Sequence, residues 1–559
     1  MKIKNLLSLS LFSLCTVAAF AQTPVLIKDV DPFGYGNPKN FCSANGTLYF
    51  VALNTFEGYE LWKSDGTDAG TVLVKDIYPG TQRSDIGAIV AYNGKAYFKA
   101  NDGTNGYELW VSDGTDAGTH MVKNIGTADN SLDPSEFYVF NGALYFTARV
   151  NGTGITLWKT DGTEAGTVQL KTLYTSANAS NASYFATMNN HLYFFSSENP
   201  LMSTDLWKSD GTEAGTSIIK NYGGLTGALY VDGNRMFFGF NGEGANALNR
   251  GLYVSDGTEA GTVKVKDINV GNLAFFPVNG TGLVKKGKFI FIADDGVHGD
   301  ELWTSDGTEA GTQLLKDITV GIESGVTVQT YLTQGNGSQF FFVAKETGSS
   351  VREIWTSDGT EAGTHLLDTP GAGSEYPANL YAYNGYLFYR ARSTGGAHGD
   401  ELWRTDGTQA GTKMVADLWV GPTGSSPANL YGANNMLYFN GNNGTVGFEL
   451  YGLAVSPLNT GVSSIVKNEI SVYPNPASGR IYIPFLESSV ITPLPSAPPP
   501  ARAGLRDRST IHDTRYSIHD TNGRLVQEGS LTESIDISNL EKGIYILKVA
   551  EGVARFVKN

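Results

Sequence analysis

The sequence predicts an all-β protein: a closed β-propeller of about nine four-stranded blades, followed by a small Ig-like β-sandwich. Three observations support this prediction. A motif recurs about every 48 residues, each repeat holds four strand-like segments, and 68 glycines accompany 11% aromatic residues. Glycine costs about 1 kcal/mol relative to alanine inside a helix, so this composition favours strands and tight turns. A chain of 559 residues also exceeds one ordinary core, which favours a repeat array or several domains.

The repeat is clearest at residues 60–67, which read Glu-Leu-Trp-Lys-Ser-Asp-Gly-Thr. Its aromatic residue recurs seven more times at spacings of 46 to 52 residues, each time with an Asp three positions later. A truncated ninth copy, Glu449-Leu450-Tyr451, lacks the Asp-Gly-Thr turn. The eight aromatic and Asp positions are Trp62 and Asp65, Trp110 and Asp113, Trp158 and Asp161, Trp207 and Asp210, Tyr253 and Asp256, Trp303 and Asp306, Trp355 and Asp358, and Trp403 and Asp406.

Each unit carries four strand signals, as residues 87–125 illustrate. An apolar segment at 89–92 leads into Asn-Gly, which favours a type I′ hairpin turn. The segments 95–100 and 107–112 follow around a second turn, and 119–125 comes after the Asp-Gly-Thr loop. Four short antiparallel strands within about 40 residues are typical of one propeller blade.

The two ends of the array predict how it closes. Residues 25–30 match the fourth strand of a unit, and no first three strands precede them. The ninth unit supplies three strands, at 430–431, 437–439 and 449–451, and no fourth. We therefore expect the N-terminal strand to complete the last blade, which would protect two strand edges. An open or spiral array, or a count of eight blades, is the alternative.

The motif residues are interpreted as structural. A ring of Trp side chains could stack sugars, but both faces of a blade pack against its neighbours, which favours a core role. The repeated Asp could bind calcium, but calcium takes six to eight oxygen ligands and each loop offers one carboxylate and a Thr hydroxyl. Asp followed by Gly fits a turn in which the carboxylate accepts backbone N–H bonds. We therefore expect no cofactor, with calcium as the alternative.

Signs of catalysis or nucleic-acid binding are few. The seven histidines include no pair spaced for a metal, and no G-x-S-x-G motif occurs. Asp294 and Asp295 are adjacent turn residues, whereas glycosidase carboxylates face each other. A carboxylate pair meeting across the ring stays open as an alternative. The net charge of −15 argues against a nucleic-acid partner, because phosphate binding needs a concentrated basic face.

The N-terminus predicts export. Lys2 and Lys4 precede an apolar run to about residue 20, and a small-x-small site ends at Ala21 before Gln22. This pattern is typical of a secretory signal peptide over 1–21, cleaved between Ala21 and Gln22. No later run is long enough to span a membrane. Cys42 would then stand alone, so an intrachain disulfide is not expected.

The repeats resemble the ELWxxDGT repeat family of exported proteins of Bacteroidota, over roughly residues 22–454. The resemblance implies secretion and no established enzymatic activity. We expect a linker at 455–468 before the pattern changes.

The tail at 469–559 is similar to the type A sorting domain of the type IX secretion system. Three motifs carry the resemblance: Tyr-Pro-Asn-Pro-x-x-Gly from 473, Leu-x-x-Gly-Ile-Tyr from 540, and a basic final strand. The resemblance implies recognition by the type IX machinery, removal of the tail, and frequent attachment of the product to surface lipopolysaccharide. The positions that match are Pro474, Pro476, Gly479, Gly543, Tyr545 and Lys558.

A Pro-rich insertion interrupts this tail at about 486–515. Five prolines between 493 and 500 cannot pair within a central strand, so we predict that the insertion is disordered.

Function is expected on the parts that do not repeat. The first hypothesis is a secreted or cell-surface scaffold that binds a glycan or a protein through loops at one rim of the propeller. One alternative is a glycan-processing enzyme with carboxylates in the channel. The other is a structural spacer in adhesion or gliding.

Overall fold

A computed structural model describes residues 23–125, 132–150, 153–199, 204–222, 224–242, 251–269, 282–326, 331–335, 337, 339–367 and 374–458, and in the tail 480–482, 515–520, 525–530, 534–549 and 552–558. The chain forms two compact units, 1–458 and 459–559. The signal peptide and the insertion up to residue 514 lie outside the described residues.

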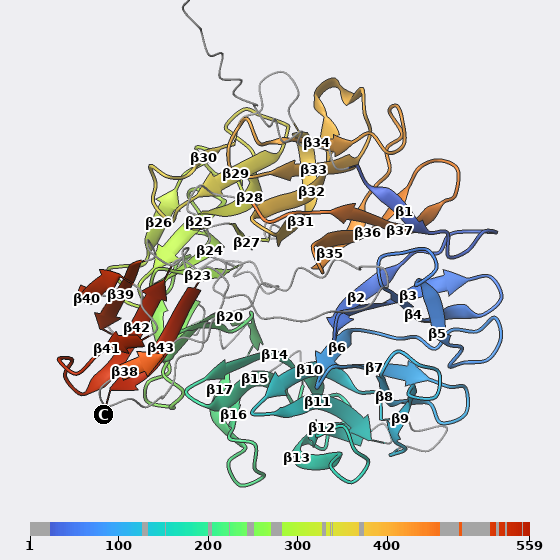
Figure 1. Cartoon of the computed structure of the whole chain (residues 1–559), viewed down its shortest axis with the longest axis horizontal. Helices are drawn as coiled ribbons and strands as arrows, with labels where there is room; N and C mark the ends of the chain where they lie inside the picture. Colours follow the sequence, from blue (N-terminus) through green and yellow to red (C-terminus); the bar gives the residue numbers. More distant parts are fainter. Residues whose placement is uncertain are drawn as a thin grey trace, which may run out of the picture. The chain divides into compact units, whose positions relative to one another are not determined.

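The first unit consists of nine antiparallel sheets that follow one another around a central axis, as Figure 1 shows. We call them blades 1 to 9 in chain order. The strands of blades 1 to 3, from the axis outward, are β2 (Lys39–Ala44), β3 (Thr47–Asn54), β4 (Gly58–Ser64) and β5 (Val72–Lys75); β6 (Ile89–Tyr92), β7 (Lys95–Asn101), β8 (Tyr107–Ser112) and β9 (His120–Lys123); and β10 (Ser135–Phe140), β11 (Ala143–Val150), β12 (Thr153–Thr160) and β13 (Val168–Tyr174).

Blades 4 to 6 keep this order, except that two short strands pair with β20 at the inner edge of blade 5. Their strands are β14 (Ser180–Met188), β15 (His191–Ser197), β16 (Thr204–Ser209) and β17 (Ser217–Tyr222); β18 (Gly224–Thr226), β19 (Tyr230–Asp232), β20 (Arg235–Gly242), β21 (Gly251–Ser255) and β22 (Val263–Lys266); and β23 (Leu283–Lys285), β24 (Lys288–Asp294), β25 (Asp300–Ser305) and β26 (Gln313–Lys316).

Blades 7 to 9 complete the series, with a short 3-10 turn, η2 (Thr394–Gly396), in blade 8. Their strands are β27 (Thr333–Gln334), β28 (Phe340–Ala344), β29 (Glu353–Ser357) and β30 (His365–Leu366); β31 (Ser374–Tyr383), β32 (Tyr386–Ser393), β33 (Glu401–Thr405) and β34 (Lys413–Ala416); and β35 (Ala428–Ala433), β36 (Met436–Asn442), β37 (Phe448–Ala454) and β1 (Val25–Lys28).

The hairpin turns follow from local sequence. In blade 1 the turn between β2 and β3 is Asn45-Gly46, with φ of 48° and 77°. Both residues of a type I′ turn need positive φ, which Asn and Gly tolerate best. Asn93-Gly94 repeats the turn in blade 2, with φ of 48° and 73°. The predicted hairpins therefore form where the Asn-Gly pairs stand.

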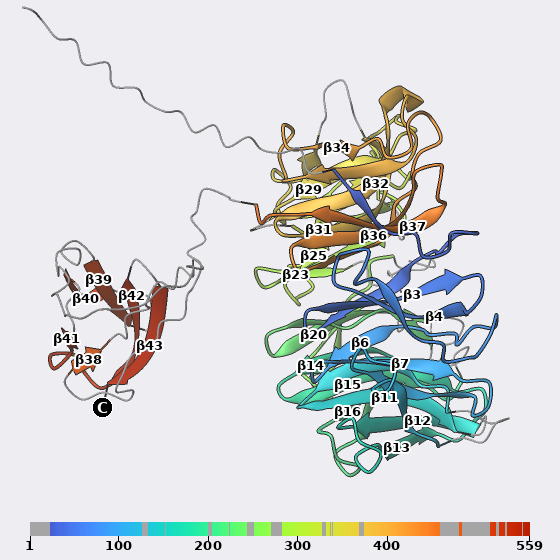
Figure 2. The same ribbon diagram turned by 45° about the vertical axis from the view of Figure 1, so that its right-hand side comes forward.

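The N-terminal strand completes the last blade. β1 pairs antiparallel with β37, with Val25 opposite Gly452 and Leu26 opposite Tyr451. In Figure 2, the dark blue strand β1 lies against the orange strands of blade 9, where β37 is its hydrogen-bonded neighbour. The predicted pairing of the first strand with the ninth blade is therefore present.

Blade 9 also packs against blade 1, and we call this junction the seam. Ile27 and Tyr438 of blade 9 share one hydrophobic cluster with Leu48 and Trp62 of blade 1. Lys28 forms an ion pair of 3.0 Å with Asp68, and Lys75 forms the equivalent 3.0 Å pair with Asp116 between blades 1 and 2. The seam thus uses the contacts of an ordinary blade junction.

The first unit continues to Leu458, beyond the predicted end at 454. Val455 is buried in the blade 9 cluster, and its N–H donates to the Asn435 carbonyl at 2.7 Å. Leu458 N–H donates to the Asn384 carbonyl at 2.8 Å. The start of the expected linker therefore packs on the propeller.

The second unit contains two sheets within its described residues. One is four-stranded, in the order β40 (Leu525–Ser530), β39 (Arg515–Asp520), β42 (Gly543–Val549) and β43 (Gly552–Lys558). The other pairs β38 (Arg480–Tyr482) with β41 (Ser534–Asp536). The core of the second unit includes the buried side chains of Ile518, Ile535 and Leu547, which come from both sheets. Among the described residues of the whole chain, no helix is long and apolar enough to cross a membrane.

Candidate functional site

The four-stranded blade places two kinds of loop on opposite sides of the propeller. One side carries the inner hairpin turns and the Asp-Gly-Thr loops, such as 65–71; we call it the repeat side. The other carries the turns between the second and third strands, such as 54–57, and the long connections between blades, such as 76–88. We call this second side the loop side.

The motif aromatic residues are buried at the junctions between blades. The eight side chains are between 2% and 7% exposed. Trp62 packs against blade 9, Trp110 against blade 1 and Trp403 against blade 7, so each Trp contacts the preceding blade. None of the eight side chains presents a surface on which a sugar could stack.

The Asp-Gly-Thr loop is held together by its own hydrogen bonds. In blade 1, Asp65 Oδ1 accepts the Thr67 N–H at 2.9 Å and the Thr67 hydroxyl at 2.7 Å. Gly66 has φ of 92°, and a Cβ on Gly70 would lie 2.1 Å from Asp65 Oδ1. The Thr67 hydroxyl and N–H bonds lower the pKa of Asp65, and the bonds of Asp113 to Thr115 lower the pKa of Asp113 in the same way.

The same bonds recur at Asp161, Asp210, Asp256, Asp306, Asp358 and Asp406. The carboxylates therefore act within turns. Among the described residues, no group of three or more His, Cys, Asp or Glu side chains is arranged to hold a metal ion.

These loops also join neighbouring blades. Gly114 lies against the preceding blade, where a Cβ would be 2.8 Å from the Tyr49 hydroxyl. Lys63 of that blade donates to the Gly114 carbonyl at 2.7 Å. The Gly of the motif is thus required both by its φ of 89° and by this close approach.

The Glu of the motif organises the loop side, a role that sequence reasoning did not assign. Glu60 is fully buried on β4. Its carboxylate accepts the N–H groups of Ile77, Tyr78 and Ser84 at 3.0, 3.3 and 3.1 Å, and the Ser84 hydroxyl at 2.7 Å. One side chain therefore holds both ends of the connection from blade 1 to blade 2.

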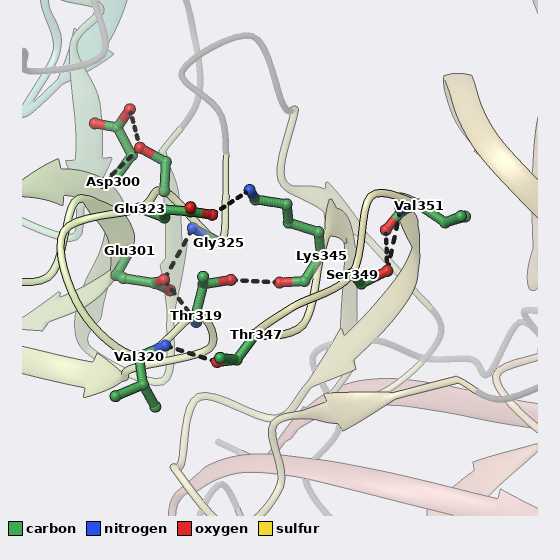
Figure 3. A network of polar contacts seen from close by, with 11 residues as sticks. Asp300, Glu301, Thr319, Val320, Glu323, Gly325, Lys345, Thr347, Ser349 and Val351 are labelled. Carbon is green, nitrogen blue, oxygen red and sulfur yellow. Dashed lines mark hydrogen bonds and ion pairs between the residues drawn. The ribbon is translucent and has the colours of Figure 1, made fainter.

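Blade 6 repeats this arrangement, which Figure 3 shows at close range. Glu301 accepts N–H bonds from Ile318, Thr319 and Gly325 at 3.1, 3.0 and 2.9 Å. The Thr319 hydroxyl then donates to the Lys345 carbonyl of blade 7 at 2.7 Å (Figure 3). The buried Glu thus fixes a loop that also contacts the next blade.

The pKa of the motif carboxyl groups shifts in opposite directions on the two sides, because hydrogen bonds within the loop lower it on the repeat side. On the loop side the largest influence is burial. It raises the pKa of Glu60, Glu301 and Glu449 to about 7, although the loop hydrogen bonds partly offset it. Burial also raises the pKa of Glu401.

The two histidines in matching sequence contexts make different contacts. His298 bonds through Nδ1 to Asp295 of its own turn at 2.8 Å, and His398 bonds to Asp417 of the following connection at 2.7 Å. Asp294 and Asp295 accept backbone N–H bonds within the turn, as expected from sequence.

A pocket of about 450 Å³ opens on the loop side of blade 9. We call it the seam pocket, because its walls come from the first and the last segments of the propeller sequence. The segment 32–35 follows β1, Trp419 follows β34, and residues 442–447 form the turn between β36 and β37. Asp29 and Asn442 supply polar groups to the lining, which includes no Lys, Arg or His.

Aromatic side chains line this pocket. Phe33 is 76% exposed and Tyr35 is 55% exposed. Phe33 packs edge-on against Phe56, with ring centroids 5.7 Å apart, and Tyr35 packs against Phe448 at 6.1 Å. Burial, together with the charge of Asp31, raises the pKa of Asp29. The pocket therefore combines fixed aromatic surface with a carboxyl group.

The expected sorting residues lie partly within the described tail. Gly543 begins β42, opposite Lys558 of β43. Tyr545 is 8% exposed, and its hydroxyl donates to the Glu541 carbonyl at 2.9 Å. Pro474, Pro476 and Gly479 lie outside the described residues, as do Ala21 and Gln22.

Solved structures resemble the chain only distantly. A puromycin hydrolase matches with 12% identity and a TM-score of 0.35, over 67% of this chain and 61% of its own. A prolyl endopeptidase matches with 11% identity and a TM-score of 0.39, over 73% of this chain and 55% of its own. The β-propeller domain of the trilobed protease from Pyrococcus furiosus matches with 12% identity and a TM-score of 0.31, over 57% and 94%. The chain thus spans about three fifths of the puromycin hydrolase and just over half of the endopeptidase, and at these values no activity is assigned to it.

No curated protein matches the chain. The tail, in contrast, matches a family model over residues 471–559, described as a secretion system C-terminal sorting domain. This match confirms the prediction of a type IX sorting domain, and with it export through the type IX system to the cell surface or beyond. Residues 471–559 are therefore a secretion system C-terminal sorting domain.

Proposed function

We propose that this protein is a secreted or cell-surface binding scaffold whose seam pocket takes a glycan. The observation that carries the proposal is the pocket of about 450 Å³ lined by Phe33, Tyr35 and Trp419 beside Asp29 and Asn442. Ligand pockets typically measure about 300–1,000 Å³ and combine apolar walls with a few polar groups. A sugar ring presents an apolar face to aromatic rings and hydroxyls to carboxyl and amide groups.

Rigidity of the walls supports the proposal. Tyr35 lies against Gly447, where a Cβ would be 2.3 Å from its ring, and Trp419 lies against Gly444, where a Cβ would be 2.7 Å from its ring. Both glycines have φ near 80°, with 83° at Gly444 and 81° at Gly447. Aromatic groups held in place lose little conformational entropy when a ligand binds.

The sorting domain supports the proposal that the protein binds its glycan outside the cell. On this proposal a Sec signal peptide delivers the chain to the periplasm, the type IX machinery recognises the tail, and surface lipopolysaccharide retains the product. The glycan would then be met at the cell surface or in the medium.

The test is a glycan array probed with the secreted full chain, followed by calorimetric titration of each hit. We expect Trp419→Ala and Phe33→Ala to weaken binding about tenfold or more, since each 1.4 kcal/mol lost is one decade in Kd. The matched controls are Tyr331→Ala and Tyr376→Ala, which remove aromatic side chains 62% and 49% exposed outside the pocket. Binding no stronger than that of the heat-denatured chain, or equal loss in the controls, would contradict the proposal.

A further inference from the structure

Buried polar atoms without a hydrogen-bond partner recur at the same place in several blades, and we call each such place a gap. In blades 1, 8 and 9 the connecting loop is described throughout, and in blade 6 it is described up to residue 326 and again from 331. There the polar atom of the motif aromatic residue is buried and has no partner among the described residues. These atoms are Trp62 Nε1, Trp303 Nε1, Trp403 Nε1 and Tyr451 OH. Every one of these side chains is at least nine-tenths buried.

An acceptor without a partner accompanies each of these donors. The Asp that follows the outer strand has a buried Oδ1 that bonds to no described group. These residues are Asp76, Asp317, Asp417 and Asp29, in the same blade order. A buried donor or acceptor that is left unpaired lowers stability, so the recurrence of such pairs in four blades needs a physical explanation.

The donor and the acceptor lie in the same region of each blade. Leu61 pairs with Lys75 across β4 and β5, which places Asp76 beside Glu60, two residues before Trp62 on the same face. In blade 9, burial raises the pKa of the Tyr451 hydroxyl to about 12, and the nearby charges of Glu449 and Asp29 act in the same direction.

Blades 3 and 4 show how the gap is filled when a hydroxyl is present. In blade 4, Trp207 Nε1 donates to the Tyr174 hydroxyl at 3.4 Å, and that hydroxyl donates to Asp205. In blade 3, Trp158 Nε1 donates to the Thr156 hydroxyl at 2.8 Å, which donates to the Ala148 carbonyl at 2.9 Å. In both blades one oxygen accepts from the indole and donates to an acceptor.

Blades 3 and 4 differ from blades 1, 6, 8 and 9 at the Glu position of the motif. Thr156 and Asp205 replace the Glu, whereas blades 1, 6, 8 and 9 keep it. Where the Glu is present, its oxygens are engaged by the connecting loop, as at Glu60 and Glu301. Among the described residues, no group is then left to bridge the motif aromatic residue and the Asp.

The chemistry of the gap selects its occupant. A metal cation would face the indole N–H, which is a donor only, and an anion would face two carboxyl groups. A small neutral molecule that accepts one hydrogen bond and donates another satisfies both sides, and buried water does this in most globular proteins. We propose that blades 1, 6, 8 and 9 each hold one ordered water molecule that bridges the motif aromatic residue to the Asp after the outer strand.

A crystal structure of the secreted protein, at a resolution that shows ordered water, tests this directly. We expect a water peak within hydrogen-bond distance of Trp62 Nε1 and Asp76 Oδ1, and of the equivalent atoms in blades 6, 8 and 9. We expect none beside Trp158 or Trp207. Empty density in the four blades, or a peak with metal coordination, would overturn the proposal.

A solution measurement gives a second readout. The Raman band of tryptophan that reports hydrogen bonding at Nε1 should show no indole population with a free N–H. The variant Thr156→Val removes the hydroxyl partner of Trp158 while keeping the shape of the side chain, and should create one free N–H as a calibration. A free population in the unmodified protein several times larger than this calibration would contradict bridging water.

Discussion

The two sides of the propeller use the same repeat in different ways. On the repeat side, eight Asp-Gly-Thr loops make the same bonds within themselves and lie against the preceding blade. On the loop side, a buried Glu such as Glu60 or Glu301 holds a connection whose remaining sequence differs between blades. The comparison shows that the repeated residues serve the scaffold on both sides. The ligand recognition that we propose therefore rests on the variable segments of the loop side.

Removing a buried Glu should have the largest effect on this comparison. Glu60→Ala leaves the N–H groups of Ile77 and Tyr78 without an acceptor, and it leaves the Ser84 N–H and hydroxyl with the Tyr59 carbonyl alone. We expect the free energy of unfolding to fall by about 2–4 kcal/mol, measured by urea denaturation. Glu309→Ala, at an exposed position of a repeat-side loop, is the control and should change stability by less than about 0.5 kcal/mol. Equal losses in the two variants would refute the role given to Glu60.

Variants at the seam test whether blade 9 packs against blade 1 as tightly as other neighbouring blades pack against each other. Ile27 on β1 is 4% exposed, whereas Val25 on the same strand is 51% exposed. Ile27→Ala should lower the unfolding free energy by about 2–3 kcal/mol through the lost apolar contacts, and Val25→Ala by much less. Calorimetry of both variants distinguishes them. If Ile27→Ala unfolds like the unmodified protein, β1 does not hold the seam in solution.

A smaller effect is expected on the repeat side. Gly114→Ala meets both a φ of 89° and the Tyr49 hydroxyl, whereas Gly94→Ala meets a φ of 73° with its nearest contact at 3.8 Å. We expect losses of about 2 kcal/mol for Gly114→Ala and about 1 kcal/mol for Gly94→Ala. Adding Tyr49→Phe to Gly114→Ala should recover part of the difference. Without such recovery, the contact between the blades is not the cause.

The carboxyl groups on the two sides should also make contributions to folding stability that change in opposite directions with pH. Hydrogen bonds from Thr115 hold the pKa of Asp113 below its ordinary value of 3.8, so its contribution to stability is present above pH 3.8 and is lost as pH falls. The pKa of Glu60 rises from 4.5 to about 7 by burial, so its contribution is present below pH 4.5 and is lost as pH rises through about 7. We expect the melting temperature to be highest near pH 5.

Variants can separate the two limbs of this pH profile. Glu60→Gln should make the decline above pH 5 less steep, and Asp113→Asn should make the decline below it less steep. Each effect is partial because the other motif Glu and Asp residues keep their pKa shifts. Thermal melts across the pH range measure both slopes. A decline above pH 5 that Glu60→Gln leaves unchanged would show that this glutamate does not titrate there.

Much of the fold could be predicted from the repeat. The Asn-Gly turns and the four strands of each unit follow from local patterns. The pairing of residues 25–28 with the last blade follows from the incomplete units at the two ends of the repeat array. The end of the propeller was less predictable, because Val455 and Leu458 look like a linker until the Asn435 and Asn384 carbonyls are in place. The tail motifs were predictable because their residues are specific, as the match over 471–559 bears out.

The candidate site could not be predicted, because its parts are far apart in the chain. Phe33 and Trp419 are ordinary loop residues in sequence, and they come together only when β1 joins blade 9.

The sequence by itself determined the repeat, the strands and turns, and the sorting domain, because each of these depends on residues close together along the chain. The tertiary structure decided the rest. It showed that the Glu of the motif, which no local pattern distinguishes from an exposed charge, is fully buried and binds a loop 17 to 24 residues away. It also set the register between blades, and with it which aromatic side chains become core and which line a pocket, because burial depends on contacts between blades that adjacent residues do not specify.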